Sequence, residues 1–155
     1  QNHNKIKKIL LVQINLIPNK PINTPGCKLF HTDWNLPIEM HSEYKFLFFE
    51  TVKEHLYKQT QSLGAPSFEI TNFWFQQYTE NGMHNWHTHA NVNFSNVYFL
   101  ECPEGSSTEF KNFKIECKEG DVLSFPAFLP HRSPEIHNQN RKTVIAFNTN
   151  ITYPE

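Results

Sequence analysis

The sequence predicts a mainly β protein, a sandwich or barrel of short antiparallel strands with one helix packed on its outside. One segment before Pro66 has helical periodicity, and the chain after it alternates short runs of Phe, Val, Ile and Tyr with turn residues. No βα alternation and no repeat period is present. A length of 155 residues suits one hydrophobic core. We therefore expect a single domain over 1–155, with a strand and helix extension over 1–66 and the β core over 67–155.

The first apolar run, KIKKILLVQINLI at residues 5–17, superficially resembles a signal peptide because basic residues precede it. Gln13 and Asn15 interrupt the run, however, and no small-residue cleavage site follows. We predict a strand here. No run in the chain approaches the length needed to span a membrane.

A helix is predicted over residues 42–63, SEYKFLFFETVKEHLYKQTQSL. Its apolar residues recur at a spacing of three to four, at Tyr44, Leu47, Phe48, Val52, Leu56 and Leu63. Gly64 follows directly and Pro66 lies just beyond, as at many helix C-termini. One apolar stripe indicates a helix that packs on an outer face.

Strands are predicted in the runs FEITNFWFQQY, NVYFL, TEFKNFKIEC, DVLSFP and KTVIAFN, which are separated by turn sequences such as TENG, CPEGSS and KEGD. The segment before the helix, IPNKPINTPGCKLFHTDWNLP at 17–37, is rich in proline and is expected to be irregular. Specificity for a substrate often lies in loops of this kind.

Charge and cysteine content exclude several functions. The formal net charge is −1 and the pI about 6.8, so no basic excess supports general nucleic-acid binding. Three cysteines without C-x-x-C spacing argue against both a disulfide framework and a thiolate zinc site. We expect a protein of the reducing cytoplasm.

Three histidines, His84, His87 and His89, lie in the stretch HNWHTHA. If residues 86–90 are extended, His87 and His89 point to the same face and can reach one metal ion. With 9 histidines in the chain, this pair alone is weak evidence. The alternative pair, His84 and His87, has a spacing that suits a helix better.

Two later elements add to the histidine pair. The stretch KEGDVLSFPAFLPH is a turn and a strand that ends near His131, and RKTVIAFN places Arg141 at the start of a core strand. The ordered set, over about residues 72–150, resembles the iron(II) and 2-oxoglutarate-dependent oxygenases. It is most similar to small bacterial and phage members with H-x-H, F-P-x-x-x-x-H, R-x-S/T and F-N motifs.

This resemblance implies a double-stranded β-helix (a jelly roll, as in cupins) with a helix outside it. It implies a dioxygenase that uses Fe(II), O2 and 2-oxoglutarate to hydroxylate an unknown substrate. His87, His89 and His131 match the metal ligands, and Arg141 matches the partner of the far carboxylate of 2-oxoglutarate. Thr143 would assist the arginine and Tyr98 would bind the co-substrate, with Tyr78 a weaker candidate.

Alternatives remain at several positions. The superfamily usually has Asp or Glu where this chain has His89, and three neutral imidazoles also suit zinc or nickel. His89 can instead lie outside the set of direct ligands. Lys142 replaces Arg141 if the last strand is shifted by one residue, and Trp86 can line the substrate pocket. The alternative function is a cupin-like metal-binding module, or a three-histidine metalloenzyme that does not use 2-oxoglutarate.

Overall fold

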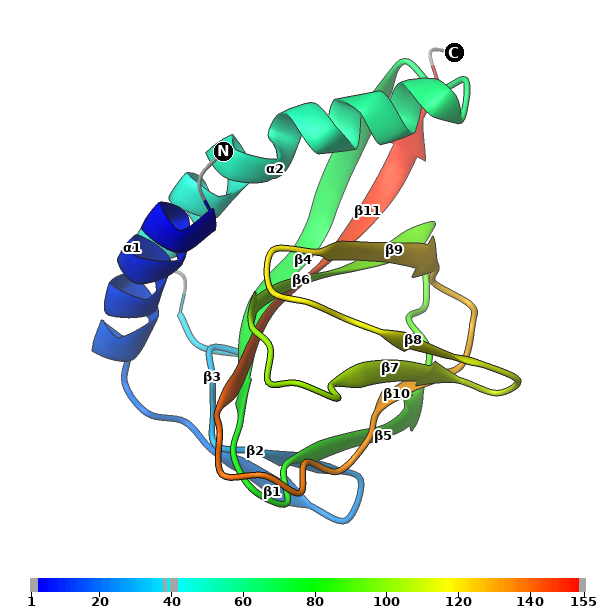
Figure 1. The fold of residues 1–155 in the computed structure, drawn as a ribbon. Coiled ribbons are helices and arrows are strands. Elements are labelled where there is room, and N and C mark those ends of the chain that lie inside the picture. Colours follow the sequence, from blue (N-terminus) through cyan, green and yellow to red (C-terminus); the bar gives the residue numbers. More distant parts are fainter. Residues whose placement is uncertain (1–2, 38, 40–41, 154–155) are drawn as a thin grey trace.

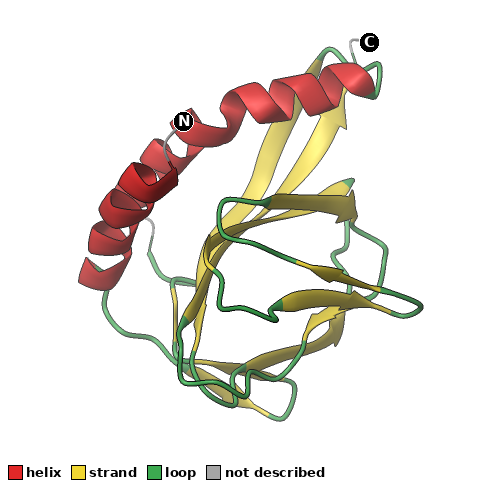
Figure 2. Cartoon of the chain, in the orientation of Figure 1, coloured by secondary structure: helices red, strands yellow, loops and turns green. Residues whose placement is uncertain are grey.

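The computed structural model describes residues 3–37, 39 and 42–153. In these residues two antiparallel sheets face each other, and two helices cover the outer face of one of them (Figures 1 and 2). The mainly β class and the double-stranded β-helix are confirmed.

Each sheet combines strands from distant parts of the chain. The five-stranded sheet has the order β3 (His31–Thr32), β4 (Ser67–Tyr78), β11 (Lys142–Thr152), β6 (Phe94–Glu101) and β9 (Val122–Pro126). The six-stranded sheet has the order β1 (Ile22–Thr24), β2 (Cys27–Leu29), β5 (Met83–His87), β10 (His131–Ser133), β7 (Ser107–Phe110) and β8 (Lys114–Glu116).

The predicted helix is confirmed as α2 (Ser42–Ser62). Tyr44, Phe48, Val52 and Leu56, four residues apart in sequence, form its buried stripe. The helix ends in a Schellman motif, in which Ala65 N–H donates to the Thr60 carbonyl at 3.1 Å and Gly64 N–H to the Gln61 carbonyl at 3.0 Å. Gly64 has φ +71°, a conformation in which a side chain is strained.

The strand predicted over residues 5–17 was wrong, because residues 3–16 form helix α1 (His3–Leu16). Leu10 and Ile14 are its buried residues, one helical turn apart, and Ile17, which directly follows the helix, is buried as well. They pack into the same core cluster as Phe48 and Leu56 of α2. Tertiary packing of this apolar stripe thus decides the conformation of a segment rich in isoleucine.

Alternation along β11 separates the helix side of the five-stranded sheet from the interior between the sheets. Ile145 and Phe147 pack into the core beneath the helices. Lys142, Val144, Ala146 and Asn148 instead face the six-stranded sheet, where they line a cavity. The register pairs Ile145 with Phe75 and Ala146 with Trp74 of β4. Phe75 therefore lies on the helix side together with Ile145, and Trp74 lines the cavity together with Ala146.

The proline-rich segment is more regular than its sequence predicts. Its hairpin β1–β2 joins the six-stranded sheet beside β5, with Cys27 opposite His84, and β3 joins the five-stranded sheet. Asp33 secures the segment to the core, since its carboxylate accepts hydrogen bonds from Tyr44 Oη at 2.6 Å and Phe75 N–H at 2.8 Å. The run TEFKNFKIEC likewise forms a hairpin, β7–β8, and not one strand.

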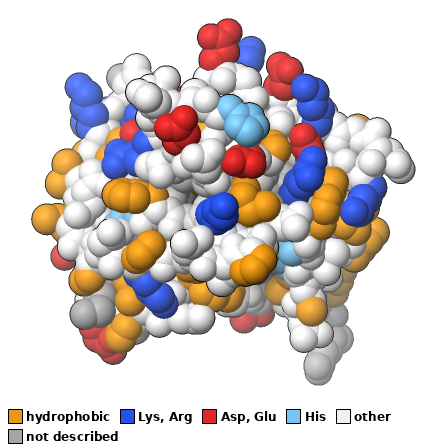
Figure 3. All heavy atoms as spheres, turned by 90° about the horizontal axis from the view of Figure 1, so that it is seen from below, with side chains coloured by type: hydrophobic (Ala, Val, Ile, Leu, Met, Phe, Trp, Pro, Cys, Tyr) orange, Lys and Arg blue, Asp and Glu red, His pale blue; other side chains and the backbone are white. Residues whose placement is uncertain are grey.

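Neither described helix is long and apolar enough to cross a membrane. The face shown in Figure 3 has acidic, basic and hydrophobic side chains interspersed.

Candidate metal centre

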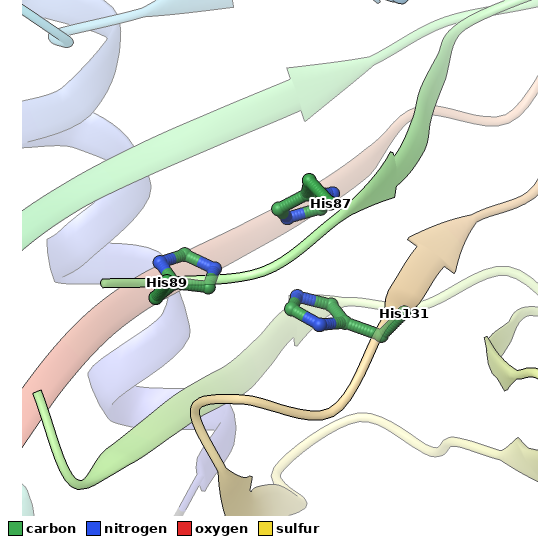
Figure 4. A group of neighbouring side chains, drawn as sticks. All are labelled: His87, His89 and His131. Atoms are coloured by element: carbon green, nitrogen blue, oxygen red, sulfur yellow. The ribbon is translucent and has the colours of Figure 1, made fainter.

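Three histidines meet at one end of the space between the sheets. His87 ends β5, His131 begins β10, and the two residues are direct cross-strand partners. His89 follows β5, and its backbone N–H donates to the Ala127 carbonyl at 3.0 Å. This hydrogen bond joins the segment after β5 to the loop between β9 and β10. One ligand nitrogen from each ring lies within 4.8 Å of the others, and Figure 4 shows the three rings around a common space.

Backbone carbonyls fix the orientation of two of these rings. Asn85 O lies 2.7 Å from His87 Nδ1, and Leu129 O lies 2.9 Å from His131 Nδ1. Because a carbonyl only accepts, each Nδ1 carries the ring proton, and the lone pair is on Nε2. Metal-binding histidines typically donate the hydrogen of their other ring nitrogen to an acceptor of this kind.

His89 has a different partner. Its Nδ1 lies 3.3 Å from Asn148 Nδ2, while Asn148 Oδ1 accepts a hydrogen bond from Ser95 Oγ at 3.0 Å. In this arrangement Nδ1 accepts, so Nε2 carries the proton. Ligation through Nε2 therefore requires the Asn148 amide to turn over, so that its oxygen faces Nδ1.

Burial keeps all of these imidazoles neutral. It lowers the pKa of His89 to about 4, with the neighbouring His87 adding to the effect, and it lowers the pKa of His131 to about 4. Burial lowers the pKa of His87 as well. Neutral imidazoles are the form that binds metals, so the donor set fits a divalent transition metal without loss of protons at neutral pH.

A fourth histidine, His84, belongs to the same cavity wall. Its ring stacks on that of His87 with centroids 3.9 Å apart and planes 11° apart. Burial and the three other histidines lower its pKa to about 3. Its Nδ1 lies 3.4 Å from Gln76 Nε2. The structure therefore groups His87 with His89 and His131 as possible ligands, and places His84 against them.

The cavity between the sheets has a volume of about 50 Å³. Side chains of both sheets line it, among them Trp74, Tyr78, Phe99, Thr108, Phe125, Ser133 and Lys142. None of the described residues around it is Asp or Glu. A metal ion held here would thus have no acidic side chain in the lining to balance its charge.

Lys142 is the buried cation of this cavity. Lys142 is 3% exposed, and its Nζ donates a hydrogen bond to Ser133 Oγ at 3.0 Å. Nζ also lies 5.3 Å from the ring centre of Tyr78 and 5.6 Å from that of Phe99. Burial lowers the pKa of the amine. Among the described residues no carboxylate pairs with it, so an anion in the cavity would find an unneutralised partner.

The structure does not bring Arg141, Thr143 or Tyr98 to this cavity. Arg141 makes a two-point ion pair with Glu101, at 2.8 Å and 3.1 Å, and Thr143 Oγ1 donates to the same carboxylate. Thr143 also lies on the face of β11 opposite Lys142. Tyr98 lies beneath the helices, where its hydroxyl is 2.6 Å from His3 Nδ1. The register of β11 thus differs by one residue from the one predicted.

Tyr78, the weaker candidate of the sequence, does line the cavity, and its hydroxyl donates to Gln76 Oε1 at 2.9 Å. Trp86 lies elsewhere, between Lys111 and Arg132, whose charged groups are 3.9 Å and 4.9 Å from its ring centre. Sequence reasoning missed Asn148 and Ser133. For Asn148 a signal existed, since it shares the period-two face of Lys142, Val144 and Ala146.

Neither a protein-family model nor a curated protein sequence matches the chain. Solved structures do match it. A 2OG-Fe(II) oxygenase family oxidoreductase from Burkholderia pseudomallei has a TM-score of 0.72 at 12% identity, over 92% of this chain and 77% of that one. A Pseudomonas putida prolyl-4-hydroxylase has a TM-score of 0.67 at 12% identity, over 98% and 89%.

A Trichoplax adhaerens prolyl hydroxylase, solved in complex with a hypoxia inducible factor peptide fragment, has a TM-score of 0.66 at 13% identity, over 95% of this chain and 79% of that one. Sequence identity at this level shows the fold alone. The resemblance inferred from the motifs is thereby confirmed at the level of architecture: the chain has the double-stranded β-helix fold of 2OG-Fe(II) oxygenases and prolyl hydroxylases, with a three-histidine group between its sheets.

Proposed function

We propose that the protein is an iron(II) and 2-oxoglutarate-dependent dioxygenase. His87, His89 and His131 would hold the metal, and Lys142 would bind the distal carboxylate of 2-oxoglutarate in place of Arg141. The observation that carries the proposal is the buried Lys142 ammonium, which lies in the same cavity as three neutral imidazoles and has no carboxylate partner among the described residues.

The charges of the cavity support a dianionic co-substrate. A ferrous ion on three neutral ligands would keep two positive charges, and Lys142 would add one, while 2-oxoglutarate supplies two negative charges. Arg132 also lines the cavity, but Glu109 balances its charge at 2.6 Å. The 2-oxo acid end of 2-oxoglutarate would chelate the metal, and its far carboxylate would pair with Nζ of Lys142. The hydrogen bond to Ser133 and the rings of Tyr78 and Phe99 beside Nζ would hold the ammonium in position.

When bound, iron supplies the oxygen chemistry of the reaction. One oxygen atom of O2 would enter the succinate that forms, together with CO2, from 2-oxoglutarate. The other oxygen atom would convert a C–H bond of the substrate into C–OH. The chain would provide the metal ligands, the anion partner and a cavity between the two sheets that holds them together. Because the cavity measures about 50 Å³, we expect lining side chains to move when the whole co-substrate enters.

The test is an anaerobic titration of the purified protein with iron(II) and then 2-oxoglutarate, followed through the weak visible charge-transfer band of the chelate. A band that saturates at one equivalent supports the proposal, and succinate should then form on admission of O2. Iron binding without a band would instead favour a metal-binding module, or a three-histidine enzyme that does not use an oxo acid. Zinc-loaded protein is the control, since it cannot give the band.

A further inference from the structure

Helix α1 has apolar side chains on its outer side as well as on its buried side. Ile9, Val12 and Leu16 are 39%, 63% and 80% exposed. They are three and four residues apart, so they form one row, on the side of the helix away from the buried Leu10 and Ile14. A single exposed leucine is ordinary, but a row of apolar side chains in water indicates a surface that contacts another molecule.

Helix α2 extends this apolar surface. The two helices lie together on the outer side of the five-stranded sheet (Figure 1), and residues of both pack into one core cluster. Phe46 of α2 is 71% exposed and Tyr57 is 50% exposed. They are about three helical turns apart, on the side of α2 away from the buried Phe48. We call the outer surface of the two helices the helix face, marked by Ile9, Val12, Leu16, Phe46 and Tyr57.

The part of the helix face on α1 is basic. This helix contains three lysines and no Asp or Glu. Lys7 pairs with Glu119 at 2.7 Å, whereas Lys5 and Lys8 are exposed and form no ion pair among the described residues. Each of these two lies four residues before an apolar residue of the exposed row, which is a neighbouring position on a helix. Positive charge therefore lies directly beside the apolar row of α1.

The part of the helix face on α2 is acidic. Glu43, Glu50 and Glu54 are exposed, and their spacing of seven and four residues places them on one side of the helix. Lys53 balances Glu50 at 2.6 Å, but Glu43 and Glu54 have no ion-pair partner among the described residues. The other exposed lysine of α2, Lys58, lies beyond these carboxylates, near the C-terminal end. Negative charge therefore accompanies the exposed rings of α2.

Opposite charges on two helices of one face are what a symmetric dimer requires. In a two-fold dimer the same surface of both copies meets, so that a residue i that contacts residue j of the partner is matched by j contacting i. A two-fold axis that runs between the helices places α1 of each copy on α2 of the other. The lysines then meet glutamates twice, and the apolar rows cover one another.

We propose that the helix face binds a second copy of this chain. Helices of 14 and 21 residues are about 21 Å and 31 Å long and about 10 Å wide, so the face covers about 500 Å² per copy in projection. A standard interface buries about 800 Å² per partner, so we expect a weak dimer that forms at about 10 to 500 µM protein. An anionic membrane is the poorer partner, because the glutamates of α2 would face its phosphates. The inference does not depend on the proposed function.

Sedimentation equilibrium of the purified protein tests the proposal. Between about 5 µM and about 1 mM protein, the average mass should rise from that of a monomer towards that of a dimer. Raising the salt to about 0.5 M should weaken the association, because exposed charges are screened. A monomer over the whole concentration range overturns the proposal.

The apolar contribution is tested by Leu16→Gln combined with Phe46→Gln. Both side chains are largely in water, so the fold should tolerate the change, and circular dichroism checks it. The dissociation constant of the dimer should rise at least tenfold. An unchanged constant would mean that another surface holds the copies together.

Charge reversal gives the sharper test. Lys5→Glu/Lys8→Glu makes both helices acidic on this face, and Glu43→Lys/Glu54→Lys makes both basic. Each variant alone should associate at least tenfold more weakly than the wild type. Mixed in equal amounts, the two variants should form a heterodimer, because each helix again faces the opposite charge. If the mixture does not associate, the pairing of α1 with α2 is wrong.

The matched control is Lys28→Glu/Lys114→Glu. It makes the same change in net charge at exposed residues of β2 and β8, in the sheet that the helices do not cover. The dimer of this variant should keep the dissociation constant of the wild type. A loss as large as that of Lys5→Glu/Lys8→Glu would mean that net charge, and not the helix face, governs association.

Lipid vesicles separate the alternative partner. Vesicles of phosphatidylcholine with about a quarter phosphatidylserine are sedimented with the wild type and with Lys5→Glu/Lys8→Glu. Neither protein should bind them. A wild type that stays monomeric and binds the vesicles, with binding lost in the variant, would assign the helix face to anionic lipid and overturn its assignment to a second copy.

Discussion

Replacement of Lys142 by Met should have opposite effects on ligand binding and on stability. Loss of the ammonium leaves the distal carboxylate of 2-oxoglutarate without its partner in a desolvated cavity, at a cost of about 2 to 5 kcal/mol. At about 1.4 kcal/mol per tenfold change, the dissociation constant rises about 30-fold to about 4,000-fold. Metal content should not change, because Lys142 is not one of the three residues proposed to hold the metal.

The same variant should be at least as stable as the wild type. A desolvated ammonium costs several kcal/mol, and the Ser133 hydrogen bond and two aromatic faces offset only part of this. Met fills a similar volume without a charge, so the free energy of unfolding of the metal-free protein should stay unchanged or rise by about 1 to 4 kcal/mol. Urea unfolding at pH 7 measures it.

Arg141→Ala is the matched control for that experiment. It removes the two-point ion pair with Glu101 and should lower the free energy of unfolding by about 1 to 2 kcal/mol, with the 2-oxoglutarate constant unchanged. A rise in that constant for Arg141→Ala, together with an unchanged constant for Lys142→Met, would refute the assignment of the anion partner. A clear loss of stability in Lys142→Met would show that the ammonium has a structural role.

Three further predictions follow from the histidines and from α1. Replacing His87 or His131 by Ala should abolish stoichiometric metal binding, measured by elemental analysis of purified protein. Unchanged stoichiometry in His89→Ala would assign that residue to a supporting position. For the metal-free protein, the free energy of unfolding should fall as the pH falls from about 6.5 to about 4, because the unfolded chain binds protons at the ordinary histidine pKa while the folded pKa values of His89 and His131 are about 4. His84→Ala should make this slope shallower, and an unchanged slope would contradict the burial of its ring. Leu10→Ala should cost about 2 to 5 kcal/mol in thermal or chemical unfolding, whereas Val12→Ala on the exposed side of α1 should change stability by less than about 0.5 kcal/mol. Similar losses in both variants would argue against the helical packing of this segment.

Patterns in the sequence were sufficient for the features that depend on local periodicity. The stripe from Tyr44 to Leu56 predicted α2, and the H-x-H spacing predicted that His87 and His89 share a face. The association with His131 required the motif resemblance, because the partner lies on a different strand. Nothing local in the sequence specifies that β5 and β10 are neighbours with His87 opposite His131.

The errors arose where two conformations or registers satisfy the same local pattern. Arg141 and Lys142 are adjacent cations at the start of β11, and only the packing of Ile145 and Phe147 beneath the helices decides which one turns inward. In α1, isoleucines favour a strand by propensity, but burial of Leu10 and Ile14 against α2 favours the helix. Both choices depend on contacts distant in sequence.

A metal ion bound at the proposed site would also stabilise the fold through the short strand β10. It is three residues long, and its pairing with β5 is irregular between His131 and Ser133. An ion held by both His87 and His131 would cross-link the two strands directly beside this irregular step. Metal at 1,000 times its dissociation constant adds about 4 kcal/mol to the stability of the folded state. Metal binding should then slow amide hydrogen exchange along β10, because the ion would hold this short strand against β5.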